Sequence, residues 1–259
     1  APDEPAVAAA TSPGIMQAEG YFPLIARETQ ASPRNARVLV LSPENDALRA
    51  ELLRGAGLQL ADVLEGTPAS APNSVAITKS QNDLAHAVAV LISGTRSDAA
   101  GLLTPHAVDI ILLEGTGSRV TEYANLLDAT PGLERIGTVD AGSMWRLRWE
   151  GEVPARLALQ PEQGELQSLG SGAVAAGQSL RVDSPSTLIL SETRDPSWVA
   201  TFDGEALEQI DLADGSWRQA WEVPPGEGDL TVRYGPHYLP WWQAGLALSA
   251  AILIMTAIP

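Results

Sequence analysis

Cysteine is absent from the 259 residues of the chain. Its absence excludes disulfides, thiolate metal sites and cysteine nucleophiles. A chain of this length can bury a stable core without disulfides, so an exported protein is not excluded. Basic residues are also scarce, because 16 of them stand against 32 acidic ones and give a net charge of −16. Such a surplus of negative charge repels phosphate backbones, and we expect no nucleic-acid binding.

The chain also lacks the residue patterns of common catalytic and metal sites. The histidines, His86, His106 and His237, include no pair at the i, i+4 spacing of a helical metal site. No Gly-x-Ser-x-Gly motif supports a serine hydrolase, and no pair of carboxylates is marked out for glycoside hydrolysis. Asp195 and Asp203 fit turn positions instead. We therefore expect no catalytic residue, no cofactor and no metal site.

Two glycine-rich stretches have some features of phosphate-binding turns. Residues 115–118 follow an expected strand and open an expected helix, where backbone amides could hold a phosphate. The dinucleotide fingerprint is incomplete, because Val120 occupies its sixth position and no acidic residue follows to bind a ribose. Residues 170–175 match the glycine spacing better but lie among expected strands. We interpret both stretches as turns.

The first part of the chain predicts a linker and an α/β domain. Residues 1–33 are acidic and rich in proline and alanine, without the basic start and apolar run of a signal peptide. Residues 34–150 alternate strand and helix patterns, which predicts a Rossmann-like α/β sandwich with a mixed sheet. The expected strands are 37–42, 74–78, 108–113, 133–139 and 143–149, and the expected helices are 47–54, 82–94, 97–103 and one that begins after residue 118.

Apolar residues at helical spacing define the inward faces of three of these helices. Asn82 and Asp83 are the expected cap of the clearest helix, and Gly94 is its expected end. The expected inward residues are Leu48, Leu52 and Leu53 in the first helix, Leu84, Ala87, Val88, Leu91 and Ile92 in the second, and Val120, Tyr123, Ala124 and Leu127 in the last.

Residues 151–236 show the two-residue alternation of half-buried strands. Trp198, Ala200 and Phe202 share one face of a strand that follows a turn at 194–197 and precedes the Asp203-Gly204 turn. The alternation returns in two later segments, as Trp217, Gln219 and Trp221 and then as Leu230, Val232 and Tyr234. Short strands separated by turns at this spacing predict a β-sandwich domain.

The tryptophans of this domain allow two interpretations. Trp198, Trp217 and Trp221 could stack against sugar rings, as tryptophans of carbohydrate-binding modules do. Alternating tryptophans also fill sandwich cores, and the in/out pattern favours this second interpretation. The three residues are the candidate glycan contacts of the chain.

Residues 238–259 predict a transmembrane helix. Residues 241–258 form an almost uninterrupted apolar run without a charge, close to the length of a membrane span. Tyr238, Trp241 and Trp242 stand at its start, where an interfacial aromatic belt belongs. A buried core helix is the alternative. The run stops at Pro259 without a polar flank, so we expect a truncated span.

Several of these segments carry a resemblance to a known family. The pattern of Asp195-Pro-Ser-Trp198, Ala200 and Asp203-Gly204, followed by Trp-Arg-Gln-Ala-Trp-Glu-Val-Pro at 217–224, resembles the last extracytoplasmic β-domain of large actinobacterial membrane proteins. Those proteins are family 2 glycosyltransferases with a multi-helix membrane region. A strand pair of this kind also occurs in YfhO-like membrane proteins. Residues 127–137 and 144–147 supply a second match, and the resemblance spans roughly residues 34–236 in the family's order.

The resemblance implies a place in cell-envelope glycan assembly. In that family the nucleotide-sugar chemistry belongs to a separate cytoplasmic domain with acidic metal-binding motifs, and this chain has no Asp-x-Asp. We therefore expect a non-catalytic extracytoplasmic accessory module, tethered to the lipid bilayer of the cell membrane. Two alternatives remain: a glycan-binding module for envelope polysaccharide, and a structural or assembly domain that contacts partner membrane proteins. A standalone enzyme has the weakest support.

Overall fold

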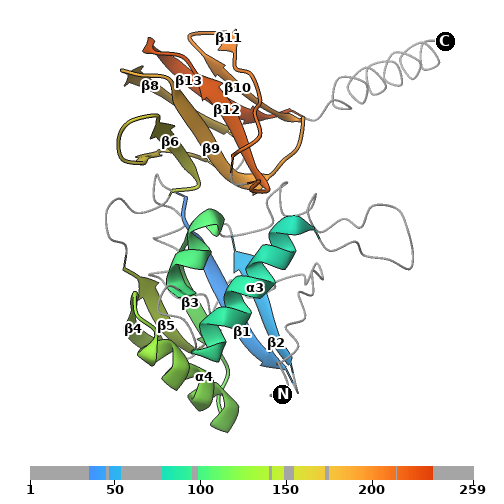
Figure 1. The fold of residues 1–259 in the computed structure, drawn as a ribbon. Coiled ribbons are helices and arrows are strands. Elements are labelled where there is room, and N and C mark those ends of the chain that lie inside the picture. Colours follow the sequence, from blue (N-terminus) through green and yellow to red (C-terminus); the bar gives the residue numbers. More distant parts are fainter. Residues whose placement is uncertain are drawn as a thin grey trace, which may run out of the picture.

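The computed structural model describes residues 35–44, 47–53, 78–94, 99–139, 142–148, 155–172, 175–213 and 215–235. This part of the chain is mostly β and forms two units, one with helices packed on a sheet and one built from two sheets (Figure 1). We call them the α/β domain and the sandwich domain. The predicted linker at 1–33 and the expected domain boundary at 150–154 lie outside the described residues.

A five-stranded sheet with the order β2-β1-β3-β5-β4 is the base of the α/β domain. Its parallel pair is β1 (Arg37–Glu44) and β3 (Val108–Glu114), and the other neighbours are antiparallel. The remaining strands are β2 (Ala47–Leu53), β4 (Leu133–Val139) and β5 (Gly142–Leu147). The mixed sheet expected from the sequence is confirmed.

The helix predicted at 47–54 is wrong, because Ala47–Leu53 is strand β2. It pairs with β1 in an antiparallel hairpin, in which Leu41 lies opposite Ala50 and Leu39 opposite Leu52. Leu48, Ala50 and Leu52 pack on the main core of the domain, so every second residue of β2 faces inward. The segment consists of good helix formers, and its composition therefore favoured a helix over this two-residue period. Sheet pairing has overridden helix propensity here.

Two α-helices, α3 (Lys79–Ser93) and α4 (Ser118–Ala129), pack on one face of the sheet together with a 3₁₀ helix, η1 (Ala99–His106) (Figure 1). All five predicted inward residues of α3 are buried, and Gly94 ends the helix in the left-handed region with φ of 63°. The predicted cap is wrong by one turn. Thr78 is the N-cap, and it forms a capping box with Gln81. Residues 74–77 of the predicted strand lie outside the described residues.

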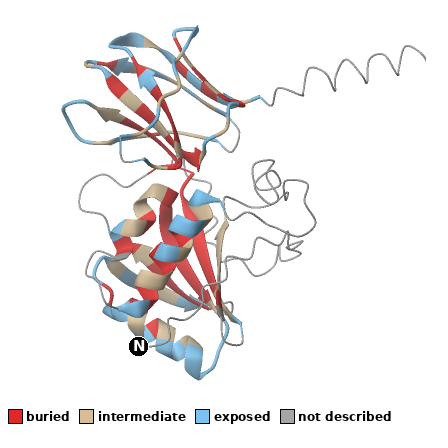
Figure 2. Cartoon of the chain, turned by 45° about the vertical axis from the view of Figure 1, so that its right-hand side comes forward, coloured by how far each residue is buried: buried red, intermediate tan, exposed pale blue. Residues whose placement is uncertain are grey.

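The core of the α/β domain lies between these helices and the sheet, and Figure 2 shows buried residues along the covered strands. Trp145 of β5 is fully buried there, and its indole Nε1 donates to Asp128 of α4 at 2.7 Å. The opposite face of the sheet carries a second, smaller buried cluster of Val38, Val40, Ile110, Leu112 and Met144.

The sandwich domain consists of two four-stranded antiparallel sheets, as the alternation predicts. One has the order β11-β10-β13-β8 and the other β12-β9-β6-β7. Their inner faces share one core that includes Leu188, Leu190, Trp198, Phe202 and Trp221. The strands are β6 (Leu157–Pro161), β7 (Gln167–Leu169), β8 (Ala175–Val182), β9 (Ser186–Thr193), β10 (Trp198–Phe202), β11 (Glu205–Ala206), β12 (Arg218–Val223) and β13 (Gly226–Tyr234).

The predicted hairpin turn after β10 is confirmed. Asp203 and Gly204 both have positive φ, at 50° and 81°, which is the geometry that an Asp-Gly turn between strands requires. As for a membrane span, no helix within the described ranges is both long and apolar enough to cross a bilayer. The predicted transmembrane helix at 238–259 lies outside those ranges.

Candidate functional site: a buried ionic cluster between the domains

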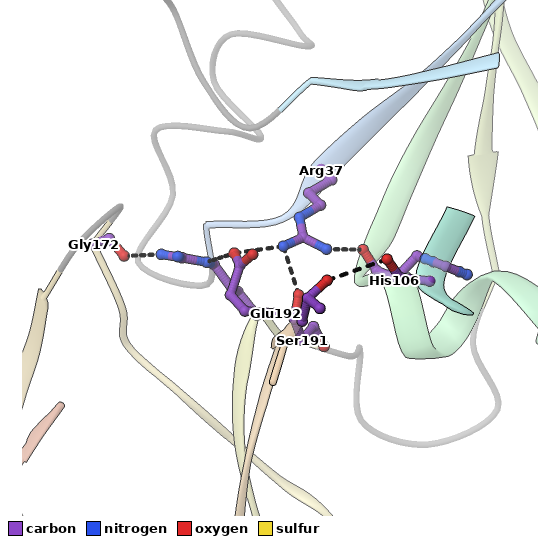
Figure 3. Close-up of polar contacts among 8 residues, drawn as sticks. Arg37, His106, Gly172, Ser191 and Glu192 are labelled. Carbon is purple, nitrogen blue, oxygen red and sulfur yellow. Dashed lines mark hydrogen bonds and ion pairs between the residues drawn. The ribbon is translucent and has the colours of Figure 1, made fainter. Parts of the chain in front are cut away.

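The most unusual polar feature lies where the two domains meet (Figure 3). Arg37, the first residue of β1, reaches from the α/β domain to the end of β9 in the sandwich. Its Nη2 forms an ion pair with Glu192 Oε1 at 2.6 Å and donates to the carbonyl oxygen of Ser191 at 2.6 Å. Its Nη1 donates to the carbonyl oxygen of His106 at 3.1 Å. The side chains of Arg37 and Glu192 are only 1% and 2% exposed, so water screens this pair little.

A second guanidinium group binds the same carboxylate from within the sandwich. Arg156 Nε donates to Glu192 Oε1 at 2.7 Å, and Arg156 Nη1 donates to the carbonyl oxygen of Gly172. The Arg156 guanidinium also lies 5.6 Å from the centroid of the Trp198 ring, a cation–π distance. Two buried positive charges therefore share one oxygen of one buried carboxylate. A cluster of this kind depends on Glu192 remaining ionised and in place.

A ring stack adjoins the ionic cluster. The imidazole of His106, the last residue of η1, stacks on the indole of Trp217 in the sandwich, with centroids 5.0 Å apart and an interplanar angle of 30°. Burial lowers the pKa of His106 from 6.5 to about 3, with further lowering from the positive charges of Arg37 and Arg218. The stack therefore involves a neutral imidazole at physiological pH.

The low pKa of His106 predicts a specific loss of stability in acid. Folding favours the neutral ring, so its contribution is complete above pH 6.5 and is lost as the pH falls from 6.5 toward about 3. The slope from this group is about 1.4 kcal/mol per pH unit. The variant His106→Phe keeps an aromatic ring that cannot be protonated. We expect the parent to lose stability relative to this variant between pH 6 and pH 4 in urea unfolding experiments.

The matched control is His86→Phe, because His86 is exposed on α3. An effect of the histidine-to-phenylalanine change that is unrelated to the junction would appear in this variant as well. Parallel curves for the parent and His106→Phe over the same range would contradict the assignment of a low pKa to His106.

The amino-terminal end of α3 completes the contact between the domains. Lys79 Nζ donates to the carbonyl oxygen of Gly215, and the hydroxyl groups of Ser80 and Thr193 lie 3.2 Å apart. The Thr78–Gln81 capping box fixes the helix start that presents Lys79 and Ser80. These contacts across the junction are polar, and the stacked rings lie beside the ionic cluster.

The three tryptophans predicted as candidate glycan contacts are all buried. Trp198 is 6% exposed and Trp221 1% exposed, and both belong to the sandwich core. Trp217 is 8% exposed, but its ring packs on His106 of the other domain rather than in that core. The register of β12 against β9 shifts between Arg218 and Gln219, which separates Trp217 from the alternation that follows. Stacking on a sugar needs an exposed ring face, so their burial does not favour this role, which stays a prediction.

The glycine-rich stretches lie where the sequence places them. Residues 115–118 join β3 to α4, and Gly117 caps the helix without a side-chain hydrogen bond. Glu114, the last residue of β3, precedes this turn, and its carboxylate accepts a hydrogen bond from Ser42 Oγ at 2.7 Å. Gly172 forms a turn in which its N–H donates to the carbonyl oxygen of Ala175 at 2.8 Å.

Other predicted residues have structural roles. Asp195 Oδ1 accepts from the Ser197 amide at 2.7 Å and Oδ2 accepts from the Tyr234 hydroxyl at 3.2 Å, as expected of a turn residue. His237 lies outside the described residues. Over the ranges that the structure describes, no group of three or more His, Cys, Asp or Glu side chains could hold a metal ion.

An open hollow of about 450 Å³ lies at the end of the sandwich farthest from the helices, near β11 in Figure 1. Five carboxylates line it, together with Phe202 and two prolines: Asp203, Glu205, Glu208, Glu222 and Glu227. The negative lining is unfavourable for an anionic ligand such as a nucleotide sugar.

Arg37, Arg156 and Glu192 were not predicted from the sequence as site residues. A signal was available, because each of these charges adjoins an apolar strand: Arg37 precedes Val-Leu-Val-Leu, Arg156 precedes Leu-Ala-Leu, and Glu192 follows Leu-Ile-Leu-Ser. Charged residues at such positions are buried only when they are paired. The pairing itself joins residues 154 to 155 positions apart, which no local pattern reveals. In comparisons with known proteins, no family model, no curated protein and no solved structure matches the chain.

Proposed function

We propose that the chain is a non-catalytic extracytoplasmic accessory module of a membrane-anchored, glycosyltransferase-like protein that acts in cell-envelope glycan assembly. The observation that carries the proposal is that the buried charged side chains at the domain junction have structural partners. Arg37, Arg156 and Glu192 bind one another and the backbone, and so hold two domains together rather than facing a cleft. The resemblance of residues 34–236 to the extracytoplasmic region of that family supports the same function.

The order of the segments supports a membrane tether at the sandwich end. Strand β13 ends at Tyr234, and the apolar segment 238–259 follows almost directly in the sequence. A transmembrane helix there would place the sandwich next to the bilayer, with the α/β domain attached to it through the ionic cluster. The large negative charge would keep such a module soluble at the membrane surface.

The two alternatives have less support from the geometry. A glycan-binding module would need exposed tryptophans, and Trp198, Trp217 and Trp221 are buried. An assembly domain would show an exposed apolar patch. Among the described residues, Val139 at 36% is the one large hydrophobic side chain that is exposed.

Topology reporters test the proposed location. Alkaline phosphatase and a cytoplasmically active fluorescent protein would each be fused before Arg37 and, in separate fusions, after Pro259. We expect phosphatase activity from the first fusion, because residues 1–236 are proposed to lie outside the cytoplasm. Fluorescence without phosphatase activity from the fusion before Arg37 would contradict the proposal. A matched fusion that lacks residues 238–259 should leave the membrane fraction.

A further inference from the structure

The two domains have separate hydrophobic cores. The main core of the α/β domain draws on β1, β2, β3, β5, α3, α4 and η1, whereas the sandwich core draws on β6 to β10, β12, β13 and Leu207. No residue belongs to both. Each domain can therefore bury its own apolar side chains without the other, and the parting of the domains would break the stack of His106 on Trp217.

The sandwich presents a set of acceptors for one guanidinium group. The carbonyl oxygen of Ser191 and Oε1 of Glu192 both accept from Arg37 Nη2 at 2.6 Å. Arg156 belongs to the sandwich itself and holds Glu192 Oε1 at 2.7 Å, so this carboxylate is oriented by its own domain. On the other side, the Arg37 backbone N–H donates to the Ala107 carbonyl oxygen at 2.8 Å, which fixes the position of Arg37 within the α/β domain.

The contact is built from buried charges. Arg37, Arg156 and Glu192 are all almost fully buried, and the two arginines share one oxygen of the Glu192 carboxylate. Repulsion between the guanidinium groups and the loss of their hydration offset much of the attraction to the shared oxygen. Polar contacts between two domains with independent cores also permit relative domain motion more readily than an apolar interface does.

We propose that the junction is a reversible latch, in which the Arg37 guanidinium enters the Ser191 and Glu192 acceptors of the sandwich and thereby sets an equilibrium between docked and undocked domains. Arg37 is the moving part, and Arg156 prepares the carboxylate that receives it. Undocking would leave both domains folded and change the distance between them. This equilibrium is a property of the chain itself, whichever component of the envelope the module serves.

Distance measurements between spin labels on the full chain in detergent test the latch. The chain has no cysteine, so Asn125→Cys on α4 and Glu205→Cys on β11, both at exposed positions, give two unique labelling sites. In this background we expect Arg37→Met to raise the population of longer distances at least about tenfold, because charge-assisted hydrogen bonds across the junction are lost. Native-state hydrogen exchange should show that the amides of β3 and β10 stay protected.

Two further variants make the outcome decisive. Lys79→Ala removes an exposed hydrogen bond across the junction and should raise the same long-distance population by a smaller factor. Arg181→Met removes an exposed arginine paired with Asp183 within the sandwich and should leave the distances unchanged. An unchanged single distance in Arg37→Met would overturn the latch. Joint loss of protection in both domains would overturn it as well, since the domains would then be one cooperative unit.

Discussion

Replacement of Glu192 by glutamine should destabilise the sandwich domain by about 3–5 kcal/mol, the cost expected when one partner of a buried ion pair is removed. The substitution keeps the shape of the side chain but removes the negative charge that Arg37 and Arg156 contact at 2.6 and 2.7 Å. Both guanidinium groups would lose this charged partner. Hydrogen exchange of the β9 and β10 amides measures the loss of free energy for this domain directly.

The matched control is Asp183→Asn, which removes a carboxylate from an ion pair whose side chains are 75% and 83% exposed. Surface substitutions of this kind change stability by no more than about 0.5 kcal/mol. A Glu192→Gln variant that unfolds within 1 kcal/mol of the parent would show that the cluster does not need an ionised carboxylate.

Trp198→Ala should cost about 3–5 kcal/mol, the range found when a buried aromatic side chain is cut back to alanine. Trp198 is 6% exposed, meets the Tyr234 ring edge-on at 5.0 Å and lies under the Arg156 guanidinium. The substitution thus opens a cavity in the sandwich core and removes the aromatic face beside a buried charge. The melting temperature of the sandwich measures the effect, and Trp221→Ala should lower it comparably.

Trp217→Ala distinguishes the junction from the core. Its ring stacks on His106, so the substitution should disturb the contact between the domains more than the stability of the sandwich. If these tryptophans instead form a glycan-binding surface, their substitution should reduce glycan binding rather than stability. A Trp198→Ala variant that melts within one or two degrees of the parent but no longer binds envelope polysaccharide would support that alternative.

Local patterns predicted the elements whose contacts are local or repeat along a strand. The helical spacing of Leu84 to Ile92 identified the buried face of α3, and the alternation of Trp198, Ala200 and Phe202 identified the inner face of β10. The Asp203-Gly204 pair predicted the hairpin turn, and both residues have the positive φ that such a turn requires. These features depend on periodicity and on backbone conformation, both of which can be read from neighbouring residues.

Contacts that join distant residues were not predictable in the same way. Strand β2 consists of good helix formers and becomes a strand only because β1 lies beside it. The Arg37–Glu192 pair spans 155 positions and two domains, and each partner alone resembles a surface residue next to a strand. Trp217 shares the alternation of a core residue, yet a register shift turns it to the junction. The candidate site was not predicted because the contacts of Arg37 join residues 154 and 155 positions apart in the sequence.

The central claim is that Arg37 and Glu192 interact directly across two domains, and a double-mutant cycle measures this interaction. The cycle comprises the parent, Arg37→Met, Glu192→Gln and the double variant, with free energies from hydrogen exchange of the β9 amides. We predict a coupling energy of about 1–3 kcal/mol, with the double variant less destabilised than the sum of the single variants. Additive effects, within about 0.5 kcal/mol, would contradict the account.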